Sequence, residues 1–338
     1  MHLTQPHDTV KRLLIPYLLT TVIMTAAASS PDGNGNTSRA HLFCRQWMSH
    51  PEPDDMSMVW FRKTFVAADK PSRVFVSIAT TGLFTLYVNG RNVSTACYMP
   101  QRTHGAATTA VMDFDIARFL RKDSNTVAVL YAPLDSSRQQ LAVTYHGITR
   151  QGQRFAHTES DGWLCRKANS RRSACGGEVM DARLGTYGWS HGDLCIALWL
   201  PVYDAEPQGA PPLRCYTTAA HTPQTHTHAT QTQTRTLQPD SCGARIWAAR
   251  SCKSVSRSDR SVVCDFSPGF YGLVRVTIRG ARKGERIDIG PLHYFCNGQL
   301  DEQAYLRFTP FYGRKIEIKG DSRFSSQQIT EVEVLETY

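Results

Sequence analysis

Apolar and polar residues alternate with period two, or form β-branched and aromatic runs, along most of this chain. In GLVRVTIRG (272–280), Val274, Val276 and Ile278 alternate with Arg and Thr residues. Successive side chains of a strand point to opposite faces of a sheet, so such a segment forms a strand with one wet face. No long amphipathic helix is apparent anywhere in the sequence. We therefore expect an all-β fold built from antiparallel sheets.

The expected strands fall into two groups. The first group comprises 59–66, 73–79, 83–90, 110–116, 126–132, 141–147 and a buried strand at 195–202, and the second comprises 261–267, 272–280, 285–290, 314–320 and 329–336. Asn89 and Gly90 predict a tight hairpin turn. Between the groups, residues 217–238 are rich in Thr and His and have almost no large apolar side chains, which predicts a linker. The chain thus divides into two β-sandwich domains, 56–216 and 239–338, after a lead segment at 29–55.

The first 28 residues have the features of an export signal. Lys11 and Arg12 precede an apolar run of 16 residues that ends in three alanines. A membrane span needs roughly 20 residues, so cleavage is favoured over a retained anchor, which stays the alternative. We expect a periplasmic or extracellular protein with no transmembrane anchor after cleavage.

Ten cysteines in an exported chain favour disulfides over metal sites, because that compartment oxidises thiols. No CxxC pair occurs. Cys165 with Cys175, and Cys242 with Cys252, have the spacing to close small loops, but the sequence does not fix the connectivity.

The net charge of +9 is spread along the chain rather than gathered into one basic block. The exception is RKANSRR (166–172), which could meet an acidic polysaccharide or a membrane surface, or form a solvated loop. Basic residues are not interleaved with aromatic residues in any nucleic-acid-binding signature, so no nucleic-acid partner is expected. GxSxG, HExxH, Walker and GxGxxG motifs are all missing from the sequence.

Several motifs in a fixed order resemble the N-terminal modules of bacterial α-L-rhamnosidases, a glycoside hydrolase family with a helical catalytic barrel. They are WFRKTF (60–65), LYVNGRNV (86–93), MDFDIARFLRKDSNTVAVL (112–130), GGEVMDARLGTYGW (176–189), SVVCDFSPGFYGLVRVTIRGARKGERIDI (261–289) and RFTPFYGRKIEIKG (307–320). The resemblance covers about residues 56–336. It departs from the family at Met180, at Pro268 with Gly269, and where Ala132 and Pro133 follow a strand. It implies a jelly-roll or galactose-binding-like first domain and a concanavalin-like second one.

Glycoside hydrolysis needs two carboxyl groups across the scissile bond, and in the resembled family both lie in the barrel. The sequence ends at Tyr338 without helical periodicity, so we expect no catalytic residues here. The leading hypothesis is a non-catalytic carbohydrate-binding or accessory protein whose partners are plant or microbial glycans, rhamnose-containing ones among them. One alternative is the N-terminal part of a split or truncated α-L-rhamnosidase that works with a separately encoded barrel. Another is a structural or interaction protein.

Two sets of residues are candidate sites. The carbohydrate-binding set combines aromatic rings for stacking with charged groups for hydroxyls, and consists of Trp163, Glu178, Asp181, Arg183 and Trp189. Its structural alternative is that Arg183 secures a loop by bidentate pairing with a carboxylate. The metal set is Asp113 and Asp115, which are two apart in a strand and so share one face. Calcium is the candidate ion, a solvated strand is the alternative, and no other cofactor is expected.

Overall fold

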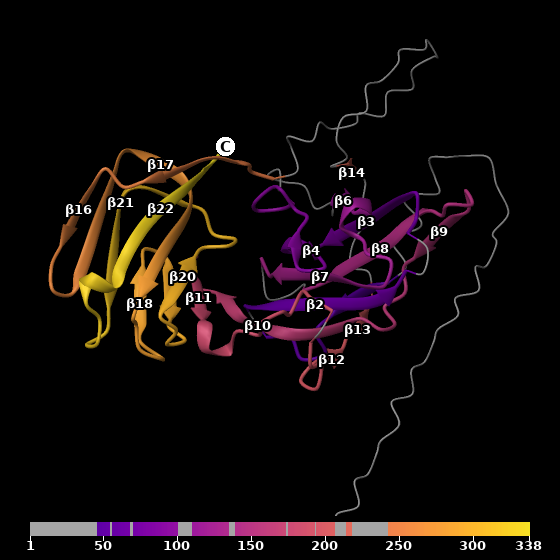
Figure 1. The fold of residues 1–338 in the computed structure, drawn as a ribbon, viewed down its shortest axis with the longest axis horizontal. Coiled ribbons are helices and arrows are strands. Elements are labelled where there is room, and N and C mark those ends of the chain that lie inside the picture. The colour runs from indigo at the N-terminus through magenta and orange to yellow at the C-terminus, as the bar shows by residue number, and fades with distance from the viewer. Residues whose placement is uncertain are drawn as a thin grey trace, which may run out of the picture. The chain divides into compact units, whose positions relative to one another are not determined.

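The computed structural model describes residues 46–54, 56–67, 70–100, 110–134, 139–173, 175–192, 194–206, 214–217 and 243–338 (Figure 1). Strands dominate this part of the chain, and its helical elements are short 3-10 turns. The predicted all-β class is confirmed. The predicted signal peptide, most of the lead segment and nearly all of the linker lie outside the described residues. Within them, no helix has the length and apolar character needed to cross a membrane.

The first group of strands forms a sandwich of two sheets. One sheet has the order β13-β1-β8-β3-β6-β14, with β9 beside β8: Tyr203–Ala205, Trp47–Ser49, Leu141–Ile148, Arg73–Thr80, Ala110–Asp115, Arg214–Thr217 and Arg154–His157. The facing strands run β11-β10-β2-β7-β4-β5, with β12 beside β10: Glu178–Asp181, Leu164–Arg172, Ser57–Val66, Ser124–Ala132, Leu83–Val88, Arg91–Asn92 and Leu200–Pro201. Their inner faces bury a core that includes Phe61, Phe84 and Phe114.

The hairpin predicted at Asn89 and Gly90 is confirmed. Both residues have positive φ, 50° and 79°, and they join β4 to β5. The Asn89 side chain accepts a hydrogen bond from the Thr126 backbone N–H and donates to the Phe119 carbonyl, each at 2.9 Å. Asn89 therefore has two roles: its backbone adopts the left-handed conformation of the turn, and its side chain anchors the turn to strand β7 and to the 3-10 turn η1 (Ala117–Phe119).

The second group of strands surrounds a core of its own. Its elements are β15 (Ile246–Ser251), β16 (Ser254–Arg257), β17 (Ser261–Arg279), β18 (Arg286–Ile289), β19 (Leu292–Phe295), β20 (Asp301–Tyr305), β21 (Phe311–Gly320), η4 (Ser326–Gln328) and β22 (Ile329–Thr337). The strands predicted at 261–267 and 272–280 form the single strand β17. Its register against β21 shifts between Asp265 and Phe270, where Pro268 cannot donate to the ladder. The core includes Phe266, Val276 and Ile316.

One parallel strand pair connects the two groups. Strand β11 pairs with β19, with Glu178 opposite Leu292 and Asp181 opposite Phe295. Because β11 also pairs with β10 and β19 also pairs with β18, the sheet is continuous from the first group of strands to the second.

The buried strand predicted at 195–202 is wrong. Only Leu200 and Pro201 form a strand, and Ile196 and Leu198 are exposed. Trp199 alone is buried there, against Trp60. The apolar residues of this segment are typical of a core strand, but the segment lies on the outer side of the sheet and buries only the Trp199 ring.

The loop-closing disulfide between Cys165 and Cys175 is also wrong, because both thiols are free. Cys165 lies near the start of β10, and Cys175 lies beyond its end. An extended strand rises about 3.3 Å per residue, which puts the two roughly 20 Å apart, whereas a disulfide needs Cα atoms within about 7 Å. Cys242, of the other suggested pair, lies outside the described residues.

Candidate functional site

Glu178, on strand β11, is buried and bonded to a distant loop. Its side chain is 2% exposed. Oε1 accepts hydrogen bonds from the backbone N–H groups of Phe308 at 2.7 Å and Arg307 at 3.2 Å, and Oε2 accepts from Arg307 N–H at 3.1 Å. A carboxylate that accepts from backbone amides satisfies donors that strand pairing leaves free. Glu178 therefore fixes the chain between β20 and β21 against β11.

Asp181 and Arg183 form the bidentate pair that the structural alternative anticipated. Arg183 donates through Nε at 2.8 Å and Nη2 at 2.6 Å to the two carboxylate oxygens of Asp181. Asp181 also caps the 3-10 turn η2 (Ala182–Leu184) by accepting from the Arg183 N–H. The hydrogen bonds from the Arg183 guanidinium lower the pKa of the Asp181 carboxyl below its ordinary value. Both side chains reach solvent, and Arg183 lies over the Phe295 ring.

The two predicted tryptophans lie in different environments. Trp163 is 5% exposed and belongs to the core between the two sheets of the first sandwich. Trp189 stacks on Trp60 with ring centroids 5.4 Å apart and lies edge-on to Tyr87 at 5.1 Å. The five predicted residues thus do not converge on one opening. Asp181 and Arg183 form a surface pair, and Glu178 and Trp163 are interior.

The two aspartates of the candidate metal site differ in environment. Asp113 is buried and accepts a hydrogen bond from the Ser77 hydroxyl. Asp115 is exposed and accepts from the Ala117 N–H at 2.9 Å. Among the residues that the structure describes, no group of three or more His, Cys, Asp or Glu side chains is placed to hold a metal ion.

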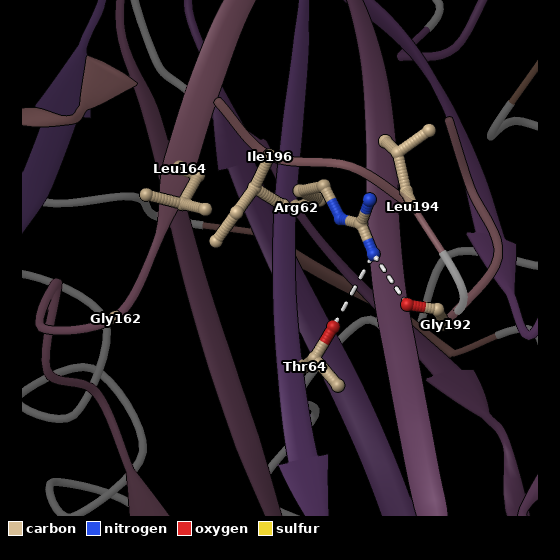
Figure 2. Close-up of a pocket in the computed structure, with 7 residues that line it drawn as sticks. All are labelled: Arg62, Thr64, Gly162, Leu164, Gly192, Leu194 and Ile196. Atoms are coloured by element: carbon tan, nitrogen blue, oxygen red, sulfur yellow. Dashed lines mark hydrogen bonds between the residues drawn. The ribbon is translucent and has the colours of Figure 1, made fainter. Parts of the chain in front are cut away.

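A cavity that the sequence analysis did not anticipate lies on the outer side of strand β2 (Figure 2). Its volume is about 330 Å³. Arg62 is the charged side chain among the described lining residues, which are Arg62, Thr64, Gly162, Leu164, Gly192, Leu194 and Ile196. Alternation along β2 could have indicated Arg62, because Trp60, Arg62 and Thr64 share the face opposite to Phe61. The burial of that face depends on residues more than 120 positions away.

Arg62 is 2% exposed although it carries a charge. Its Nη2 donates to the His191 carbonyl at 2.6 Å and lies 3.4 Å from the Thr64 hydroxyl. Its guanidinium lies over the Trp199 ring, 5.5 Å from the centroid. Burial lowers the pKa of the Arg62 guanidinium. None of the lining residues that the structure describes carries a carboxyl group.

Comparison with known proteins identifies the architecture. Residues 69–133 match the family model described as "Alpha-L-rhamnosidase N-terminal domain". The chain resembles the N-terminal part of α-L-rhamnosidases. This confirms the resemblance predicted from the sequence motifs. No curated protein matches the chain.

Solved α-L-rhamnosidase structures share the fold over most of this chain. The enzyme from Dictyoglumus thermophilum aligns with a TM-score of 0.71 and 18% identity, over 87% of this chain and 35% of its own. That from Aspergillus terreus aligns with 0.68 and 16%, over 87% and 36%. That from Streptomyces avermitilis, complexed with L-rhamnose, aligns with 0.65 and 17%, over 85% and 29%. The chain thus spans about a third of the length of these proteins.

Proposed function

We propose that this chain is a non-catalytic carbohydrate-binding or accessory module of the α-L-rhamnosidase type. The observation that carries the proposal is the cavity beside Arg62. It combines one buried cation and one hydroxyl with apolar walls, and none of its described lining residues carries a carboxyl group. Pockets for small polar ligands have this composition, with a few polar groups to orient the ligand and apolar surface to cover it.

The relation to α-L-rhamnosidases suggests the class of ligand. The matched enzymes are named for rhamnosides, and the chain shares their fold over a third of their length. Rhamnose-containing plant or microbial glycans are therefore the proposed partners. The apolar run before Ser29 further supports export to the periplasm or the extracellular space.

The second candidate is that the chain supplies the non-catalytic part of an α-L-rhamnosidase. The same partial coverage of the matched enzymes favours it. In that case a separately encoded catalytic barrel is the partner, and hydrolysis appears only when both are present.

Calorimetric titration of the full chain tests the proposal. Oligosaccharides that carry rhamnose should bind, matched oligosaccharides without rhamnose should bind more weakly, and an aryl rhamnoside should not be hydrolysed by the chain alone. Titrations with calcium and with a chelator test the Asp113 and Asp115 hypothesis. Failure of every rhamnose-containing glycan to bind in either condition would refute the binding function. Hydrolysis by the isolated chain would show that it contains an acid pair of its own.

A further inference from the structure

We propose that the cavity beside Arg62 binds a carboxylate group, as carried by a hexuronic acid residue. The sugar part of this inference rests on the proposed function, whereas the carboxylate part rests on the cavity alone.

The Arg62 guanidinium is buried without an opposite charge. Among the described residues no carboxylate pairs with it, and the groups that accept from its Nη2 are neutral oxygens. Its Nη1 is buried and has no hydrogen-bond partner. A buried cation without a counter-ion is strongly unfavourable, and an unsatisfied buried donor adds to that cost. An anion in the adjacent space would supply the missing opposite charge.

The cavity has the size and lining for such an anion. A volume of about 330 Å³ is at the lower end of the range for ligand pockets. The Thr64 hydroxyl, which also lies 3.0 Å from the Thr126 hydroxyl, is a second polar group at the cavity. Leu164, Leu194 and Ile196 supply apolar walls. These walls reduce the polarity beside the guanidinium, which strengthens a charge-assisted hydrogen bond to it, and they suit the C–H face of a pyranose ring.

A planar monovalent carboxylate fits this site better than a phosphate or sulfate. Arg62 is the single charged side chain in the described part of the lining, so a doubly charged anion would be only half balanced there. Carboxylates and guanidinium groups also match in planar geometry. We therefore expect glucuronate and acetate to bind, and sulfate and glucose to bind more weakly.

The test is titration of the full chain at constant ionic strength with sodium glucuronate, acetate, sulfate or chloride, and with glucose. Backbone amide NMR shifts and the thermal midpoint are followed. Glucuronate should shift the amides of Thr64, Gly162 and Gly192 with a Kd in the millimolar range and raise the midpoint above that in chloride. Equal effects of all the anions would indicate an adventitious ion only and would overturn the proposal.

Three variants locate the binding. Ile196→Trp fills the cavity without touching the charge, and Ile196 is 51% exposed, so the fold should tolerate it. Arg62→Met removes the charge and keeps most of the side-chain length. Each should weaken glucuronate binding at least about tenfold, since one charge-assisted hydrogen bond contributes about a factor of ten or more. Arg118→Met, at an exposed arginine that lies over the Phe119 ring, is the matched control and should bind as the parent does.

Two outcomes would decide against the proposal. Unchanged binding by Ile196→Trp would place the anion elsewhere, even if Arg62→Met fails to fold.

Asp193 lies outside the described residues but is next to Gly192 in sequence. Glucuronate binding that appears only in Asp193→Asn would mean that the chain provides its own counter-ion. If rhamnose-containing glycans fail to bind but glucuronate binds, the proposed function is refuted and this inference stands. If rhamnose-containing glycans bind but glucuronate does not, this inference is refuted and the proposed function stands.

Discussion

Replacing Glu178 is the sharpest test of how the two groups of strands are held together. Its buried carboxylate accepts hydrogen bonds from two backbone amides that are 129 and 130 residues away in sequence. In Glu178→Ala those two donors lose their acceptor inside the protein. Phe308, which carries one of these amides, packs in the same hydrophobic cluster as Trp60 and Trp199, so the substitution should also destabilise that cluster.

The expected magnitude follows from the two amides. A hydrogen bond to a charged group contributes about 1.5–3 kcal/mol, and bonds that share one acceptor are not additive. We expect Glu178→Ala to lower the free energy of unfolding by about 3–5 kcal/mol. Glu178→Gln should lower it by only about 1–2 kcal/mol, because Oε1 alone accepts from both amides and a Gln oxygen can take that position while the charge is lost.

Urea unfolding followed by tryptophan fluorescence measures these differences. Five of the six tryptophans precede residue 200, so the signal reports mainly on the first sandwich. The control is Glu317→Ala on strand β21, where a half-exposed carboxylate pairs with Lys319 and the change should stay within about 0.5 kcal/mol. If Glu178→Ala unfolds within that same margin of the parent, the carboxylate does not stabilise the junction and the reasoning fails.

Three further predictions concern local features. Asn89→Ala should lower the free energy of unfolding by about 3 kcal/mol in urea denaturation, because it removes hydrogen bonds at a residue with φ of 50°. Burial alone would raise the pKa of Asp54, but hydrogen bonds from Ser57 and Lys167 outweigh it and hold the pKa at about 2. Since 3.8 is the ordinary value, this contribution to stability is present above about pH 4 and lost as the pH falls towards 2, and Asp54→Asn should flatten that part of the stability curve. Iodoacetamide at pH 8, read by mass spectrometry, should modify exposed thiols in the folded protein and spare buried ones, whose pKa burial raises to about 12. The exposed thiols are Cys175 and Cys195, and the buried ones are Cys165, Cys264 and Cys296.

Local sequence patterns were sufficient for most of the strands and for one turn. Alternation located β22 to within a few residues, and runs of β-branched and aromatic residues did the same for β2, β3 and β7, which are largely buried on both faces. The turn at Asn89 and Gly90 was also predictable. Few residues tolerate positive φ, so the pair identifies the hairpin without knowledge of the rest of the fold.

Where a segment lies in three dimensions was not predictable from such patterns. The run at 195–202 is apolar enough for a core strand, but the core is already filled by the sheets, and only Trp199 finds a buried place. Cys165 and Cys175 are close in sequence, but a strand between them keeps them apart. In both cases local spacing gives no information about what the chain packs against.

The residues of the predicted sugar site show how a motif can be recognised while the role of its members stays hidden. Glu178 and Asp181 lie three residues apart, but the sequence separation from their hydrogen-bond partners differs greatly. Asp181 pairs with Arg183 two residues on, which local reasoning anticipated. Glu178 binds amides more than a hundred residues later, and Arg62 is buried by a loop equally distant in sequence. Long-range partners determine whether a charged side chain supports the fold or faces a ligand. It follows that Arg62, which has an unpaired donor and lines a cavity, is a more informative target for binding experiments than the predicted motif at Glu178, Asp181 and Arg183.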